Sequence, residues 1–95
     1  MNTKKLRYAI LKEIDNGNKF LSEDDFTVTA EEFDEAVRFL NRENYLGGIF
    51  YADDRPRLFE GTAYLTEYGE DYLEKNNSFA KTYRGLKEIR DWLKL

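Results

Sequence analysis

Residues 28–49 read VTAEEFDEAVRFLNRENYLGGI, and this stretch decides the fold. Thr29 is a favourable helix N-cap, and Glu32 three residues later completes a capping box. Apolar residues then recur at helical spacing, at Ala30, Phe33, Ala36, Val37 and Leu40. The pattern predicts a helix from Thr29 to Glu43, followed after Gly47-Gly48 by a β-strand. A recognition helix followed by the first strand of a wing has this order in a winged helix-turn-helix.

Further helices are predicted before this segment. Residues 4–15 place apolar side chains on one face, and Asn16-Gly17 is a good stop signal. The next stretch is too short and too acidic for a full second helix. Ser22 instead predicts the cap of a single turn whose Phe26 points inward.

A hairpin and two helices are predicted after it. The runs 49–51 and 58–60 flank Asp53-Asp54-Arg55-Pro56, which is rich in turn residues, and Pro56 belongs in the loop or on an exposed edge. Residues 66–75 form a helix capped by Thr66, with Tyr68 inward and Gly69 allowing close backbone packing. Residues 78–93 form one last helix with an apolar stripe of Phe79, Tyr83, Leu86, Ile89 and Leu93. The expected fold is therefore α+β: a single winged helix-turn-helix domain over residues 1–95, with about four helices and a small antiparallel β-hairpin wing.

Composition excludes much of the usual catalytic chemistry. The 95 residues include no Cys and no His, so thiol nucleophiles, imidazole acid/base catalysis and Cys/His zinc sites are ruled out. No catalytic constellation, cofactor site or metal site is predicted, and the protein is expected not to be an enzyme. No apolar run approaches the length needed to span a bilayer, so no membrane association is expected and a cytoplasmic location is predicted.

Charge is unevenly distributed along the chain. Residues 1–19 carry five bases and two acids, 20–74 carry four and fifteen, and 75–95 carry six and two, which gives +3, −11 and +4 and sums to −4. Clustered carboxylates at the start of a recognition helix would meet phosphate repulsion in the major groove. The predicted partner-binding residues for a basic protein are therefore Glu23, Asp24, Asp25, Glu31, Asp34 and Glu35.

Two alternatives stay open. Carboxylates at the helix start and arginines at its end also complement the helix dipole, with Asp34 and Arg38 as a favourable pair four residues apart. A DNA-binding transcriptional regulator would instead use Arg38, Arg42, Arg55 and Arg57 as nucleic-acid contacts, although Asp53 and Asp54 beside the wing arginines also suit local ion pairing. DNA binding is disfavoured by the acidic recognition helix.

The C-terminal helix offers a further interface. Its stripe has a/d-like spacing, which suits packing on the first helix or a homodimer through this helix. Trp92 projects away from the stripe beside basic residues, so it is predicted either as an interface residue or as a side chain that completes the core.

Four motifs resemble the YjcQ family: KLRYAILKEI near the start, DDRP at the hairpin tip, LTEYGEDYL after it, and KEIRDWLK at the end. Their order and spacing cover nearly the whole chain. The resemblance implies a small winged-helix protein of Gram-positive bacteria and their phages or prophages, with no established biochemical role. The expected function is thus a phage- or prophage-type interaction module that binds a protein, with a DNA-binding regulator or an acidic DNA mimic as alternatives.

Overall fold

The computed structural model describes residues 2–58 and 61–94. In this part of the chain the elements are α1 (Thr3–Asp15), α2 (Glu23–Phe26), α3 (Ala30–Arg42), β1 (Leu46–Gly47), β2 (Phe50–Ala52), β3 (Arg55–Arg57), β4 (Tyr64–Leu65), α4 (Glu67–Lys75), α5 (Asn77–Thr82), the 3₁₀ helix η1 (Leu86–Glu88) and α6 (Ile89–Lys94). The α+β class is confirmed. The expected number of about four helices is wrong for the described residues, and the winged-helix assignment stays a prediction.

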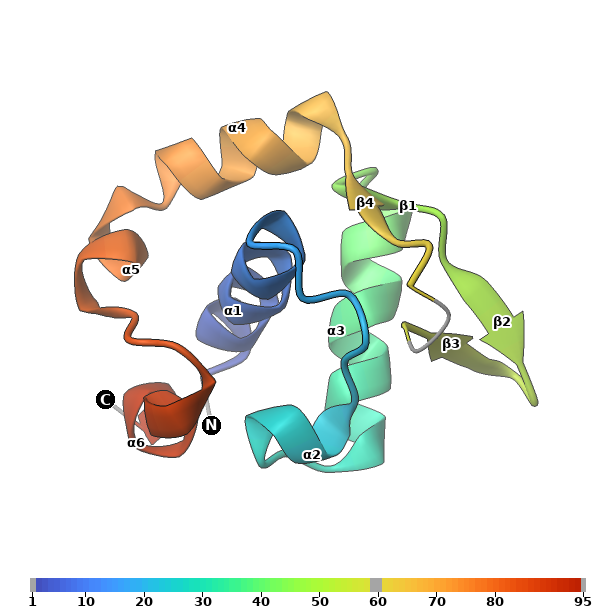
Figure 1. Ribbon diagram of the computed structural model, residues 1–95, viewed down its shortest axis with the longest axis horizontal. Helices are drawn as coiled ribbons and strands as arrows, with labels where there is room; N and C mark the ends of the chain where they lie inside the picture. Colours follow the sequence, from blue (N-terminus) through green and yellow to red (C-terminus); the bar gives the residue numbers. More distant parts are fainter. Residues whose placement is uncertain (1, 59–60, 95) are drawn as a thin grey trace.

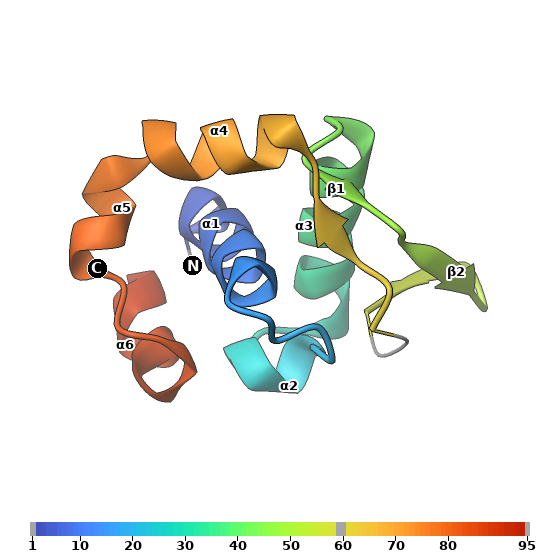
Figure 2. The same ribbon diagram turned by 45° about the horizontal axis from the view of Figure 1, so that its top comes forward.

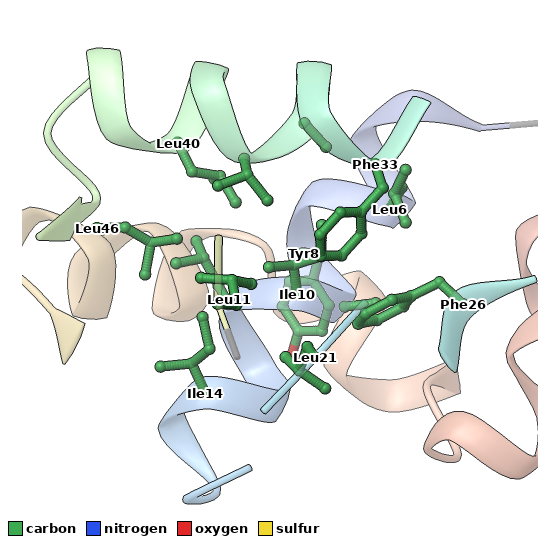
Figure 3. Close-up of a cluster of buried hydrophobic side chains, with 14 of the residues drawn as sticks. Leu6, Tyr8, Ile10, Leu11, Ile14, Leu21, Phe26, Phe33, Leu40 and Leu46 are labelled. Atoms are coloured by element: carbon green, nitrogen blue, oxygen red, sulfur yellow. The ribbon is translucent and has the colours of Figure 1, made fainter. Parts of the chain in front are cut away.

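Helix α1 lies at the centre of the fold. The other helices surround it, with α3 on one side and α4, α5 and α6 along the other (Figures 1 and 2). The apolar face of α1 is buried against side chains from α2, α3 and β1, among them Phe26, Phe33, Leu40 and Leu46 (Figure 3). The ends of the chain meet, because the Asn2 backbone N–H donates to the Leu93 carbonyl oxygen at 3.2 Å. One contiguous core therefore joins the first helix to the last.

Local capping explains where three helices begin. The Glu32 backbone N–H donates to Thr29 Oγ1 at 3.1 Å, and the Thr29 N–H donates to Glu32 Oε1 at 2.9 Å, which confirms the predicted capping box. Helix α2 is the predicted single turn, with Ser22 at its N-cap and Phe26 fully buried. Thr66 caps α4 by accepting from the Gly69 N–H at 3.1 Å. Each of these helices begins at a residue that contacts the residue three positions later. Such pairs can be recognised from their spacing in the sequence.

The predicted hairpin forms as two separate antiparallel ladders. β1 pairs with β4 at the base, and β2 pairs with β3 at the tip with Tyr51 opposite Pro56. Asp53 and Asp54 both have positive φ, as the two central residues of a type I′ turn require. The second strand of the tip is therefore Arg55–Arg57 and not the predicted run 58–60, of which residues 59 and 60 lie outside the described residues. Pro56 is tolerated because β3 belongs to a two-stranded sheet, although the residue is buried.

The predicted last helix is wrong as a single element. Helix α5 ends at Thr82, Gly85 has φ 96° and ψ −176°, and the chain resumes as η1 and α6. A positive φ is readily adopted by glycine and breaks the helical repeat. The apolar side chains of residues 78–93 therefore do not form one continuous stripe along a single helix. Tyr68, expected to point inward, is also 60% exposed.

Candidate functional site

The β2–β3 hairpin is fastened to the outer side of α3. Arg55 Nε donates to Asp34 Oδ2 at 2.6 Å, and Arg55 Nη2 donates to Asp34 Oδ1 at 3.0 Å. This is the bidentate geometry in which a guanidinium holds a carboxylate most specifically. The Asp34 side chain is buried, so the pair connects the hairpin to the body of the fold.

Glu23 extends this ion pair to α2. Its Oε1 accepts from Arg55 Nη2 at 2.9 Å, so one guanidinium contacts two carboxylates on different helices. Hydrogen bonds from Arg55 to Asp34 first, and to Glu23 second, raise the pKa of Arg55. Together Glu23, Asp34 and Arg55 form what we call the Arg55 clamp, which joins α2, α3 and β3.

Two further contacts continue along the same stripe of α3. Arg38 Nη2 donates to the Asp54 carbonyl oxygen at 2.8 Å, and the Tyr51 hydroxyl lies 3.4 Å from Asn41 Oδ1. Asp34, Arg38 and Asn41 are spaced by four and three residues, so they line one face of the helix. The hairpin consequently covers part of the surface that a recognition helix would present to DNA, and both views show it lying beside α3 (Figures 1 and 2).

The four arginines considered as nucleic-acid contacts all have partners in the described chain. Arg38 and Arg55 hold the hairpin, as above. Arg42 lies 3.7 Å from a Glu43 carboxylate oxygen, and its guanidinium is 5.5 Å from the Phe39 ring centroid. Arg57 Nη2 lies 4.0 Å from Asp53 Oδ2, so local pairing at the tip is present although long. The expected pair of Asp34 with Arg38 is wrong, because Asp34 binds Arg55 instead.

The six acidic candidates separate into two groups. Glu23 and Asp34 belong to the Arg55 clamp, and Asp25 caps α2 by accepting from the Ser22 N–H at 2.8 Å. The other three are exposed, and their carboxylates have no hydrogen bond or ion pair with the described residues: Asp24, Glu31 and Glu35. The structure thus leaves half of the predicted acidic set available to an external partner.

Trp92 fills the core and does not project from the surface. It is 3% exposed, its ring lies 5.0 Å from the Tyr83 ring, and its Nε1 donates to Thr82 Oγ1 at 2.8 Å. Lys5 Nζ donates to the Trp92 carbonyl oxygen at 3.0 Å. Of the two readings for Trp92, the one in which it completes the core is confirmed, and its assignment as an exposed interface residue is wrong. The break at Gly85 causes the difference, because it changes the angular phase of α6.

A second surface was missed by sequence reasoning. A groove between α1 and α4 is lined by exposed carboxylates Asp15, Glu70 and Glu74. Glu70 and Glu74 are four residues apart on one face of α4, and this spacing was the available signal. The predicted acidic set ends at Glu35.

Residues 2–58 and 61–94 contain neither a carboxylate cluster suited to a metal ion nor a membrane-spanning helix. No group of three Asp or Glu side chains is placed to hold a metal ion. No helix there combines the length and apolar character needed to cross a membrane.

The geometry defines a small α+β domain whose hairpin is clamped to its third helix and whose outer surface carries unpaired carboxylates. Residues 4–92 match the family model described as YjcQ protein. The chain belongs to the YjcQ family. It is 55% identical over 94 residues to the uncharacterized protein YjcQ of Bacillus subtilis (strain 168), an alignment that covers 99% of this chain and 100% of that protein. The solution NMR structure of the Bacillus subtilis YjcQ protein is similar, with a TM-score of 0.71 and 52% identity over 84% of this chain and 97% of that one.

Proposed function

We propose that this protein is a winged-helix domain that carries out no catalysis and binds a basic protein through exposed carboxylates of α2 and α3. The observation that carries the proposal is the division of charge on the third helix. Arg38 of α3 donates to the hairpin and Asp34 of α3 binds Arg55 of the hairpin, whereas the carboxylates of Glu31 and Glu35 have no partner among the described residues. A partner with clustered lysines or arginines complements this surface.

Duplex DNA fits the same surface poorly. Neutralising phosphates with lysine or arginine supplies most of the non-specific affinity of a DNA-binding protein. Here the exposed N-terminal part of α3 presents Glu31 and Glu35, while the β2–β3 hairpin is held against the helix by Arg55. Binding in the major groove would require the hairpin to leave α3 and the carboxylates to approach phosphates.

The test is affinity capture from nuclease-treated lysate of the native host, with and without prophage induction. The variant is Glu31→Lys with Glu35→Lys, and the matched control is Glu88→Lys with Asp91→Lys, which reverses two exposed charges elsewhere. We expect the wild type and the control to retain the same basic protein and the α3 variant to lose it. Retention by the α3 variant, or binding of duplex DNA by the wild type at low salt, would refute the proposal.

The same capture separates a DNA mimic from other acidic binders. A mimic occupies the nucleic-acid site of its partner, so duplex DNA added to the captured complex should displace it in a salt-dependent manner. A partner that stays bound at saturating DNA uses a different surface. Either result keeps the α3 carboxylates as the contact.

A further inference from the structure

The groove between α1 and α4 is formed by two adjoining hollows. The first has a volume of about 380 Å³, and the second, toward β4, has a volume of about 330 Å³. Asp15 and Glu70 line both hollows, so they form one continuous groove. Volumes of this size are typical of ligand-binding clefts. Apolar side chains contribute to both parts, Leu73 in the first and Ile14 with Leu65 in the second.

A buried tyrosine, whose hydroxyl makes no hydrogen bond in the described part of the chain, lines the first hollow. Tyr8 is 1% exposed, and its hydroxyl makes no hydrogen bond with any described residue. Its ring is fixed in the core, with edge-on contacts to Phe79 at 5.7 Å and Tyr83 at 6.1 Å between ring centroids. Desolvation by burial and the charge of Asp15 raise the pKa of Tyr8. The hydroxyl oxygen itself keeps some exposure at the groove, so a donor that enters can pair with it in place of water.

Unpaired carboxylates surround the same hollow. Asp15, Glu70 and Glu74 are exposed, and their carboxylates have no ion pair or hydrogen bond in the described part of the chain. Lys12 also lines the hollow, so three acids face one base there. Lys19 lines the second hollow, so the excess of acids is greatest in the first. With the Tyr8 oxygen, the first hollow offers several acceptors and suits donors that carry positive charge.

We propose that the groove between α1 and α4 binds an arginine-bearing, partly apolar segment of a partner protein. A guanidinium has five N–H donors in a planar fork, which suits several acceptors better than the single ammonium of lysine. The guanidinium sits in the first hollow, where it donates to the carboxylates and to Tyr8 Oη. Apolar side chains of the segment contact Leu73 in the same hollow and Leu65 in the second. The length of the groove and the apolar side chains Leu73 and Leu65 placed along it favour a peptide over a small cation.

This site is separate from the carboxylates proposed above on α2 and α3. It uses other residues, on α1 and α4, and it stands whether or not the α3 surface binds a partner. The two proposals are distinguished by which pair of carboxylates matters: Glu70 with Glu74 for the groove, Glu31 with Glu35 for α3.

The probe is a labelled peptide of about 12 residues, roughly 18 Å long as a helix, with leucines and arginines at helical spacing. Three comparison ligands are used: the same peptide with citrulline in place of arginine, its lysine counterpart, and free argininamide. Binding to the intact protein is followed by fluorescence anisotropy and by amide chemical shifts. We expect the arginine peptide to bind with shifts in α1 and α4, the lysine peptide to bind more weakly, and the citrulline peptide and argininamide to bind at least about tenfold more weakly.

Variants of the protein show where the arginine peptide binds. Glu70→Gln with Glu74→Gln should weaken the arginine peptide by about tenfold or more, and Tyr8→Phe, which keeps the core ring, by a few-fold. Glu88→Gln with Asp91→Asn removes an equal charge from exposed residues of η1 and α6 and should leave the affinity unchanged. Absence of binding, equal binding of the citrulline peptide or argininamide, or a loss in this control variant as large as that in the α4 variant would overturn the proposal. Thermal melts of Tyr8→Phe show whether this variant is folded. If it is not, Glu70→Gln with Glu74→Gln alone decides whether the groove binds the peptide.

Discussion

Arg55 and Asp34 are 21 residues apart in the sequence, yet they form a bidentate ion pair with N···O distances of 2.6 and 3.0 Å. Asp34 lies on α3 and Arg55 begins β3, so this one contact fixes the hairpin relative to the helix. Glu23 adds a third element at 2.9 Å from Arg55 Nη2. The position of the hairpin, and hence the surface left open on α3, depends on this clamp.

Breaking the clamp should both destabilise the protein and release the hairpin. Asp34→Ala leaves the guanidinium with one carboxylate, so we expect a lower midpoint of thermal unfolding and faster amide exchange in β2 and β3 than in α1. Arg55→Lys should give a smaller loss than Arg55→Ala, because an ammonium retains charge but cannot form the fork. Asp24→Ala is the matched control, since the Asp24 carboxylate has no hydrogen bond or ion pair among the described residues. Unchanged exchange in the hairpin of Asp34→Ala would show that other contacts hold it.

The single tryptophan reports directly on the packing of α6. Trp92 is buried against aromatic rings, so its emission should be shifted to short wavelength and resist quenching by iodide in the folded protein. Trp92→Ala should cost about 3–5 kcal/mol of unfolding free energy, in the range of large aromatic truncations in cores. Trp92→Phe should cost less, because it keeps most of the ring contacts and loses the hydrogen bond to Thr82. Emission typical of a solvent-exposed indole would contradict this arrangement.

The tyrosine beside this tryptophan holds a buried carboxylate. Tyr83 Oη donates to Glu13 Oε2 at 2.6 Å, and burial first, then this hydrogen bond, raises the pKa of Tyr83. Tyr83→Phe should therefore destabilise the fold by roughly 1–3 kcal/mol, because the buried acceptor loses its strongest donor. Chemical denaturation measures this loss. Tyr68→Phe is the control, since Tyr68 is exposed, and an equal loss in both variants would contradict a specific role for the hydroxyl.

Local signals allowed much of the secondary structure to be predicted. The capping box of Thr29 and Glu32 and the cap at Thr66 are contacts between residues three apart, so their spacing is visible in the sequence. The family resemblance was likewise carried by short motifs, and the family match covers residues 4–92. The buried face of α3 followed from the 3.6-residue period alone.

Longer-range features could not be read in this way. The partner of Arg55 is 21 residues away, and nothing in the local sequence distinguishes Asp34 from the neighbouring Asp53 and Asp54. The burial of Trp92 depends on the break at Gly85, which invalidates a helical projection carried through from residue 78. The groove depends on how α1 and α4 pack, so its lining residues share no sequence motif.

Close packing at Gly69 was predicted and is present. A Cβ built at this position would overlap the Tyr45 carbonyl oxygen, a backbone atom that cannot move aside cheaply. Gly69→Ala should thus destabilise the fold by about 1–3 kcal/mol through overpacking, although alanine favours an exposed helix by about 1 kcal/mol over glycine. The measurement is the free energy of unfolding from chemical denaturation. A stabilised variant would show that α4 moves away from β1 at little cost.

The capping box of α3 makes the free energy of unfolding depend on pH in the acidic range. A hydrogen bond from the Thr29 backbone, followed by that with the Thr29 side chain, lowers the pKa of Glu32 from its ordinary value of 4.5. A carboxylate whose pKa is lower in the folded state stabilises the protein above its unfolded-state pKa, and this contribution disappears as the pH falls through the folded-state pKa. The free energy of unfolding should therefore fall between about pH 6 and about pH 3, and by less in Glu32→Gln than in the wild type. Glu31→Gln removes a neighbouring carboxylate that has no partner in the described chain, so its pH profile should match that of the wild type. If Glu31→Gln flattened the profile as much as Glu32→Gln, the pH dependence would come from the total charge of α3 and not from its cap.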